Sequence, residues 1–201
     1  MFLNTFIFLE VITNTSLLLS AVAFFFLAVL FGDALFVRID LKTLLKSIGF
    51  LLLGISCVLN LLNQTYTLPS FLMMSAALSM LFIGFIIDPL SRLSFLAPIP
   101  IVFFPFLSGH LLLFVLGLLT TVSIFQLAYT TKHRDLIPLG VGFTLLSVGE
   151  YLYHLETIER LNQLALAGSF PYLFSSLVLL GWVWSYLALR FINRFKSNDA
   201  T

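Results

Sequence analysis

LSFLAPIPIVFFPFL, residues 93–107, is an apolar segment that carries three of the seven prolines of this chain. Apolar residues also dominate on both sides of it: 60% of the 201 residues are hydrophobic, 9% are charged, and the mean hydropathy is +1.10. A soluble domain of this size needs more charged surface, whereas a lipid bilayer solvates apolar surface on every side. The composition therefore predicts an all-α, polytopic membrane protein that forms a single transmembrane domain over residues 1–201.

Six longer apolar runs reach the length of about 20 residues that a helix needs to cross the hydrocarbon core. They cover residues 11–31, 43–62, 70–87, 111–129, 136–155 and 167–191. Residues 93–107 are a shorter candidate, because each proline removes a backbone donor and interrupts α-helical geometry. This segment could be a re-entrant loop, or a short crossing in which polyproline-like backbone rises about 3.1 Å per residue rather than about 1.5 Å.

The distribution of basic residues distinguishes these alternatives, since lysine and arginine accumulate in cytoplasmic loops. With seven crossings and the N-terminus outside, only Arg160 of the ten basic residues lies outside. With six crossings the ten divide equally between the two sides. The cytoplasmic set for seven crossings is Arg38, Lys42, Lys46, Arg92, Lys132, Arg134, Arg190, Arg194 and Lys196. We therefore predict seven transmembrane helices, an exterior N-terminus, a cytoplasmic C-terminus and a location in the plasma membrane.

An internal repeat is predicted from the second and sixth spans. A shift of 93 positions pairs Gly49 and Phe50 with Gly142 and Phe143, and it also brings the preceding basic loops into register. This match suggests two parallel three-helix units joined by the proline-rich segment 93–107. In such a plan both halves have the same orientation, and their interface is a natural site for function.

Several functional classes are excluded by what the sequence lacks. A net charge of +1 provides no polyanion-binding surface, so no nucleic-acid partner is predicted. The single Cys57 cannot form an internal disulfide. Neither a Gly-x-Ser-x-Gly nucleophile motif nor a His-Glu-x-x-His zinc motif is present, and we predict no enzymatic activity.

Glu150 is the one charged residue whose depth in a predicted span needs a reason, because an ionisable group there costs about 3 kcal/mol. It lies about 21 Å along the span 136–155, in the outer third of the bilayer. His154 follows one turn later on the same helix face, and Tyr151 flanks the pair. Glu10 and His110 lie at the same outer level when the chain crosses seven times. We therefore predict that these five residues line an outward-facing ligand-binding vestibule.

Three interpretations of this polar group remain open. Glu150, His154 and His110 could ligate a transition metal. The group could instead bind a polar ligand or a proton in a pocket with aromatic walls. In the third interpretation Glu150 is protonated or paired with His154, and nothing binds. His110 and His154 could also be axial haem ligands, but nothing else in the sequence marks a haem site, and we predict no cofactor.

Other polar residues share the outer level of the predicted vestibule. Tyr66 and Tyr172 lie at this level, each near the start of a span. Asn60, Asn63 and Gln64 are expected to solvate the outer end of the second span.

The chain resembles the seven-helix membrane sensor modules found at the N-termini of some prokaryotic signalling proteins. The resemblance is carried by the exterior N-terminus, by a basic loop leading into KSIGFLLLG at residues 46–54, and by the last helices, from Gly142-Phe143 to Glu150-Tyr151 and from Gly181 to Arg190. It covers nearly the whole chain, although no kinase or cyclase domain follows the last span in this sequence. The resemblance implies sensing of a ligand from outside and signal transfer through a partner, and it assigns no catalytic residue.

Two main functions follow as expectations. In the first, a receptor-like sensor binds a small ligand in the vestibule and signals to a cytoplasmic partner. The partner would bind a face made of Arg38, Lys42, Lys46, Arg190, Arg194 and Lys196. In the second, the two three-helix units form a small carrier in which protonation of Glu150 is coupled to transport. A third class is a non-catalytic subunit of a membrane complex. The expected partners are thus the lipid bilayer and a cytoplasmic protein, a membrane protein or a second copy of the chain.

Overall fold

The computed structural model describes residues 2–37, 39–63, 67–87, 98, 100, 109–159 and 162–198. In this part the chain is all-helical, with no strand. The elements are α1 (Phe2–Val37), α2 (Leu41–Asn63), α3 (Leu68–Ile86), α5 (Gly109–Thr131), a short 3-10 helix η2 (Arg134–Leu136), α6 (Ile137–Glu159) and α7 (Asn162–Asn198). Six of the described helices are long and apolar enough to span a membrane, which confirms the prediction of an all-α, multi-pass protein. All but two residues of the segment 93–107 lie outside the described residues, so the seventh crossing stays a prediction.

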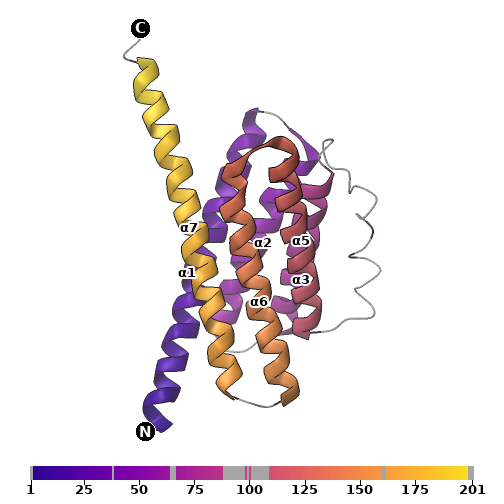
Figure 1. The fold of residues 1–201 in the computed structure, drawn as a ribbon, viewed down its shortest axis with the longest axis vertical. Coiled ribbons are helices and arrows are strands. Elements are labelled where there is room, and N and C mark those ends of the chain that lie inside the picture. The colour runs from indigo at the N-terminus through magenta and orange to yellow at the C-terminus, as the bar shows by residue number, and fades with distance from the viewer. Residues whose placement is uncertain are drawn as a thin grey trace.

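The six long helices form a closed ring. α2 packs between α1 and α3, α6 packs between α5 and α7, and contacts of α3 with α5 and of α1 with α7 close the ring (Figure 1). Aromatic side chains fill its interior. Phe50 and Phe143 lie with their ring centroids 6.1 Å apart, Phe24 packs against both, and Phe31 stacks on Phe50 at 5.3 Å. Phe85 completes this group, which we call the aromatic core, by an edge contact with Phe31.

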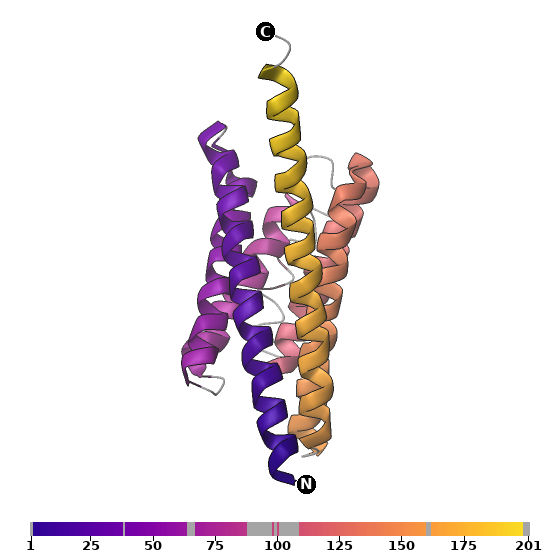
Figure 2. The same cartoon turned by 90° about the vertical axis from the view of Figure 1, so that its left-hand side faces the viewer.

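The two ends of the chain lie at opposite ends of the bundle (Figures 1 and 2). α1, α3, α5 and α7 run from the N-terminal end toward the C-terminal end, and α2 and α6 run the other way. The last residue of α3 and the first residue of α5 therefore lie at opposite ends of the ring.

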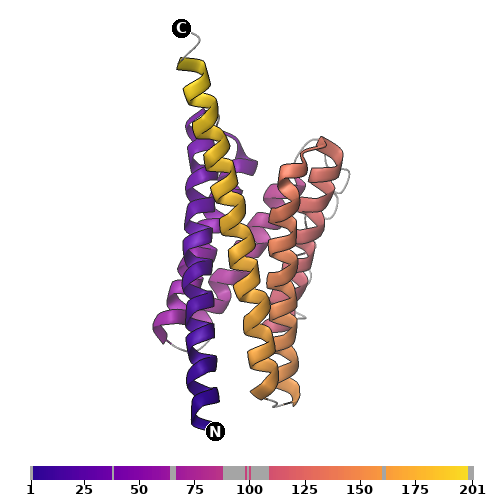
Figure 3. The same cartoon turned by 60° about the vertical axis from the view of Figure 1, so that its left-hand side comes forward.

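Helices α1 and α7 are longer than the predicted spans. α1 begins at Phe2 and α7 ends at Asn198, with 36 and 37 residues respectively. A helix of that length measures about 55 Å, well beyond the roughly 30 Å of the hydrocarbon core. The C-terminal part of α7 projects past the other helices, as Figures 2 and 3 show. The predicted boundaries covered only the most apolar run of each helix, whereas the helical backbone continues beyond that run at both ends.

The two halves of the ring make matched contacts. A Cβ atom built on Gly49 of α2 would lie 2.7 Å from Leu81 Cγ of α3, and one built on Gly142 of α6 would lie 2.6 Å from Leu179 Cδ2 of α7. Each glycine thus receives a leucine from the following helix, which permits close helix approach. In addition, a two-fold rotation of one half onto the other would exchange the α3–α5 contact with the α7–α1 contact. The internal repeat stays a prediction, and these matched contacts support it.

Lys46 does not lie on an exposed face, contrary to its prediction as part of the cytoplasmic partner face. Its side chain is only 7% exposed, and its Nζ atom lies 4.4 Å from the centroid of the Phe85 ring and 5.9 Å from that of Phe31. The reason is that Lys46 lies one turn before Phe50 on the face of α2 that is turned into the ring.

The remaining residues of the predicted partner face are only partly described. Lys42 is half-buried and lies 3.6 Å from a carboxylate oxygen of Asp40. Arg38 lies outside the described residues, as do the side chains of Arg190, Arg194 and Lys196 on the projecting part of α7. The partner face itself therefore stays a prediction.

Candidate functional site

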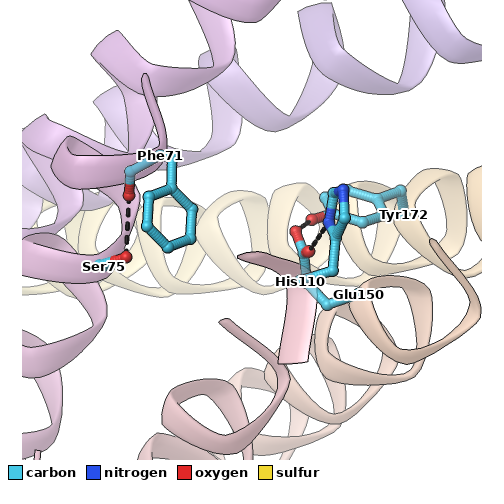
Figure 4. A network of polar contacts seen from close by, with 5 residues as sticks. All are labelled: Phe71, Ser75, His110, Glu150 and Tyr172. Carbon is cyan, nitrogen blue, oxygen red and sulfur yellow. Dashed lines mark hydrogen bonds and ion pairs between the residues drawn. The ribbon is translucent and has the colours of Figure 1, made fainter. Parts of the chain in front are cut away.

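The Glu150 carboxylate is completely buried, with 0% exposure, between three helices. Its Oε2 atom lies 2.6 Å from Nδ1 of His110 on α5, and its Oε1 atom accepts a hydrogen bond from the hydroxyl of Tyr172 on α7 (Figure 4). We call these three residues the Glu150 cluster. They lie in the half of the bundle nearer the N-terminus, about 20 Å along α6 from its first residue. Both carboxylate oxygens are therefore bound by side chains of neighbouring helices.

Three glycines allow the cluster to form. A Cβ atom on Gly149 would lie 2.5 Å from Cδ2 of Tyr172 and 3.2 Å from the carbonyl oxygen of Gly168. Because neither glycine has a side chain, α6 and α7 approach closely here, and the tyrosine ring lies directly across Gly149. On α5, Gly109 has a φ of +62°, a conformation that glycine adopts without strain, and it places His110 in the first turn.

Further hydroxyl groups extend the cluster toward α1. The hydroxyl of Tyr153 lies 2.9 Å from Oγ of Ser169, which in turn lies 3.0 Å from Oγ1 of Thr13. The Tyr153 ring lies between the other two rings, 5.6 Å from His110 and 5.8 Å from Tyr172 between centroids. Residues of α1, α5, α6 and α7 thus form one connected polar and aromatic group.

Three of the five residues predicted to line the vestibule do not join the cluster. Glu10 is exposed, and neither Glu10 nor His154 makes a hydrogen bond or ion pair within the described part of the chain. Tyr151 is 41% exposed, and its ring packs against Phe114 of α5 at 5.0 Å. The structure brings together only His110 and Glu150 of the predicted set. The pairing of Glu150 with His154 is replaced by the pairing with His110.

Helix geometry explains this difference. His154 shares a helix face with Glu150 but lies about 6 Å further along α6, one turn nearer the end of the bundle. His110 approaches from a neighbouring helix and reaches the carboxylate directly. Within the described residues no group of three or more histidine, cysteine, aspartate or glutamate side chains is placed to hold a metal ion.

Asn60 is a polar residue of the interior that sequence reasoning placed in solvent. It is only 4% exposed, and its Oδ1 atom is buried with no hydrogen-bond partner. The prediction that it solvates the end of α2 is wrong, because closure of the ring covers that end of the helix on its inner side. The sequence did carry one signal for this position. Asn60 lies one turn after Cys57 on the same helix face, and cysteine is among the most often buried residue types, as Cys57 is here.

The Glu150 cluster has two chemical capabilities. A carboxyl group and an imidazole 2.6 Å apart can share or exchange a proton, and a buried carboxylate is a strong acceptor for a ligand that brings hydrogen-bond donors. No protein-family model, curated protein or solved structure matches the chain.

Proposed function

We propose that the chain is an integral membrane sensor module that crosses the membrane seven times. It binds a small ligand at the Glu150 cluster, and it passes the signal through α7. One observation carries this proposal. The hydroxyl of Tyr172 on α7 donates a hydrogen bond to Glu150. At the other end of the bundle, the same helix continues past the other helices (Figures 2 and 3).

The direction of the helices supports seven crossings. α3 and α5 run in the same direction, and one further crossing between them would account for this arrangement. The opposite positions of the two termini favour an odd number of crossings. Combined with the basic residues, this arrangement favours an exterior N-terminus. The Glu150 cluster then lies in the outer half of the membrane, and the projecting part of α7 lies in the cytoplasm.

The aromatic core favours a sensor over a carrier. Phe143 lies about 10 Å from Glu150, toward the start of α6 and the end of the bundle at which α7 ends. Its side chain is fully buried. Phe50 and Phe85, also buried, fill the ring at and beyond this level. A carrier needs a polar path that continues across the membrane, whereas packed aromatic rings exclude water and polar substrates.

Helix α7 has local features that suit it to relay a change at Tyr172. Pro171 has no backbone N–H, so the carbonyl of residue 167 loses its helical donor one turn earlier. Beyond this point the Oγ atoms of Ser176 and Ser20 lie 2.6 Å apart, which links α7 to α1 by small side chains. A ligand that takes over the acceptor oxygens of Glu150 would release Tyr172 and allow the helix to tilt at the proline.

Loss of the Tyr172 hydroxyl is expected to move the cytoplasmic end of α7. Spin labels on Thr131→Cys of α5 and Ser197→Cys of α7, in a Cys57→Ala background, report the distance between these helix ends by double electron–electron resonance. Tyr172→Phe should shift or broaden the distribution by about 2 Å or more, the size of known signalling shifts of helices. Tyr151→Phe is the matched control, because its ring packs against Phe114 away from the cluster. Identical distributions for the labelled parent and Tyr172→Phe would contradict the proposed relay.

A further inference from the structure

Asn60 on α2 has a buried side-chain oxygen that lacks a hydrogen-bond donor within the described residues. Buried acceptors in native proteins are nearly always hydrogen-bonded, and Asn60 Oδ1 has no partner in the described residues. Such an atom is destabilising unless a bound molecule supplies the missing donor. The Asn60 side chain is more than nine-tenths buried, so bulk solvent does not readily fill this role.

Asn60 lies on the side of α2 that faces the Glu150 cluster. Cys57, one turn earlier on the same face, is buried and lies within electrostatic reach of the Glu150 carboxylate. In the predicted repeat, the shift of 93 positions aligns Cys57 with Glu150 and Asn60 with Tyr153 as equivalent positions of the two halves. Tyr153 is itself part of the polar group around the cluster. The amide therefore approaches the same interior from the opposite half of the ring.

Helix α3 contributes an aromatic ring at this level. Ser56 of α2 donates a hydrogen bond to the carbonyl oxygen of Ser70 at 2.9 Å, which fixes the start of α3 beside this part of α2. The next residue, Phe71, projects its ring from α3 toward the side on which Glu150 and His110 lie (Figure 4). Helices α2, α3, α6 and α7 thus contribute an amide, a carboxylate and aromatic rings to the interior of the ring.

These groups share a preference for a cation that carries N–H donors. The carboxylate of Glu150 and the carbonyl of Asn60 are acceptors, and the rings of Phe71, Tyr153 and Tyr172 attract positive charge to their faces. The basic side chains of Lys42, Lys46 and Arg134 lie at the other end of the bundle, near the starts of α2 and α6. Within the described residues, an anionic ligand would meet the Glu150 carboxylate beside the His110 imidazole.

We infer that the ligand of the Glu150 cluster is a small organic amine, bound as its ammonium ion. Its N–H groups donate to the Glu150 carboxylate and to Asn60 Oδ1, and its apolar part lies against Phe71 and Tyr153. Binding satisfies the unpaired amide oxygen and competes with the Tyr172 hydroxyl for Glu150. This inference rests on the proposed ligand site and names the chemical class that the site takes.

The test uses the full chain in lipid nanodiscs and a series of matched probes. Phenethylamine and n-butylamine are compared with 2-phenylethanol and n-butanol, which partition into lipid but carry no charge, and with 3-phenylpropionate as the anion. Thermal unfolding should show a saturable rise in Tm with the amines and none with the alcohols or the acid. Equal protection by the alcohols or the acid, or no protection by either amine, would overturn the inference.

Two substitutions localise the binding. Asn60→Leu should weaken amine protection at least tenfold, while leaving the Tm without ligand unchanged or higher, because it removes an unpaired acceptor. Asn63→Leu is the matched control, since that amide is exposed on the same helix. Glu150→Gln should also remove the protection. Amine protection that survives both Asn60→Leu and Glu150→Gln would place binding elsewhere and overturn the inference.

Failure of the inference and failure of the sensor proposal give different results. If the acid alone protects, and Glu150→Gln or a His110 substitution removes that protection, the cluster is a ligand site but the amine assignment is wrong. If the amines protect through Glu150 and Asn60 while the α5–α7 distance stays fixed, the amine assignment holds and the relay through α7 is wrong.

Discussion

Replacing His110 by leucine is expected to lower the free energy of unfolding by about 2 kcal/mol. The imidazole Nδ1 atom lies 2.6 Å from Oε2 of Glu150, and the carboxylate is fully buried. Without the imidazole, that buried oxygen loses the hydrogen bond that His110 supplies. The measurement is unfolding in detergent micelles, by heat and by titration with SDS, with the free energy taken from the reversible transition.

Two comparisons isolate this contact. His154→Leu makes the same chemical change at a half-buried histidine without a hydrogen bond, and it should cost less than about 0.5 kcal/mol. In a Glu150→Gln background, the cost of His110→Leu should fall to about 1 kcal/mol, because the buried partner is then neutral. Equal costs of His110→Leu in the two backgrounds would show that the carboxylate and the imidazole do not stabilise each other.

Gly149→Ala is expected to destabilise the protein by about 2 kcal/mol, although alanine favours a helix over glycine by about 1 kcal/mol. The added Cβ atom would lie 2.5 Å and 2.8 Å from two carbon atoms of the Tyr172 ring. The ring cannot shift freely, because its hydroxyl is bonded to Glu150. The helices have to separate or the tyrosine has to release the carboxylate, and unfolding in micelles should report the loss.

Gly181→Ala is the matched control for this substitution. Gly181 lies on the exposed side of α7, and a Cβ atom there meets nothing within 4 Å. The same change should therefore leave stability unchanged or raise it by up to about 1 kcal/mol. If Gly149→Ala is as harmless as Gly181→Ala, the close approach of α6 and α7 at the cluster is not what holds Tyr172 in place.

Sequence reasoning identified Glu150 because charges are so scarce in this chain. Once the loop charges are assigned, a carboxyl group deep in an apolar span stands out, and burial of that group is what the structure shows. Its partner was harder to predict. His154 is close in sequence but lies one turn further along α6, whereas His110 is brought to the carboxylate by packing of α5 against α6. Sequence gives the depth of a residue but not which helix faces it.

Tyr172, Asn60 and Lys46 illustrate the same limit in different ways. The contact of Tyr172 with Glu150 depends on an absent side chain at Gly149, and a sequence does not show which glycine faces a neighbouring helix. Asn60 and Lys46 lie near opposite ends of α2, where polar residues are usually solvated. Both are buried because the ring closes around the inner face of that helix. Their burial is a property of the assembled bundle.

The most direct test concerns the sides of the membrane on which the two ends of the chain lie. Single cysteines are placed at Asn4 near the start of α1 and at Ser197 near the end of α7, in the Cys57→Ala background, and a membrane-impermeant maleimide is added to intact cells. Seven crossings with an exterior N-terminus predict labelling of Asn4→Cys in intact cells and of Ser197→Cys only after permeabilisation. Labelling of both positions from the same side would mean an even number of crossings and would contradict a signal path from an outer Glu150 cluster to a cytoplasmic α7.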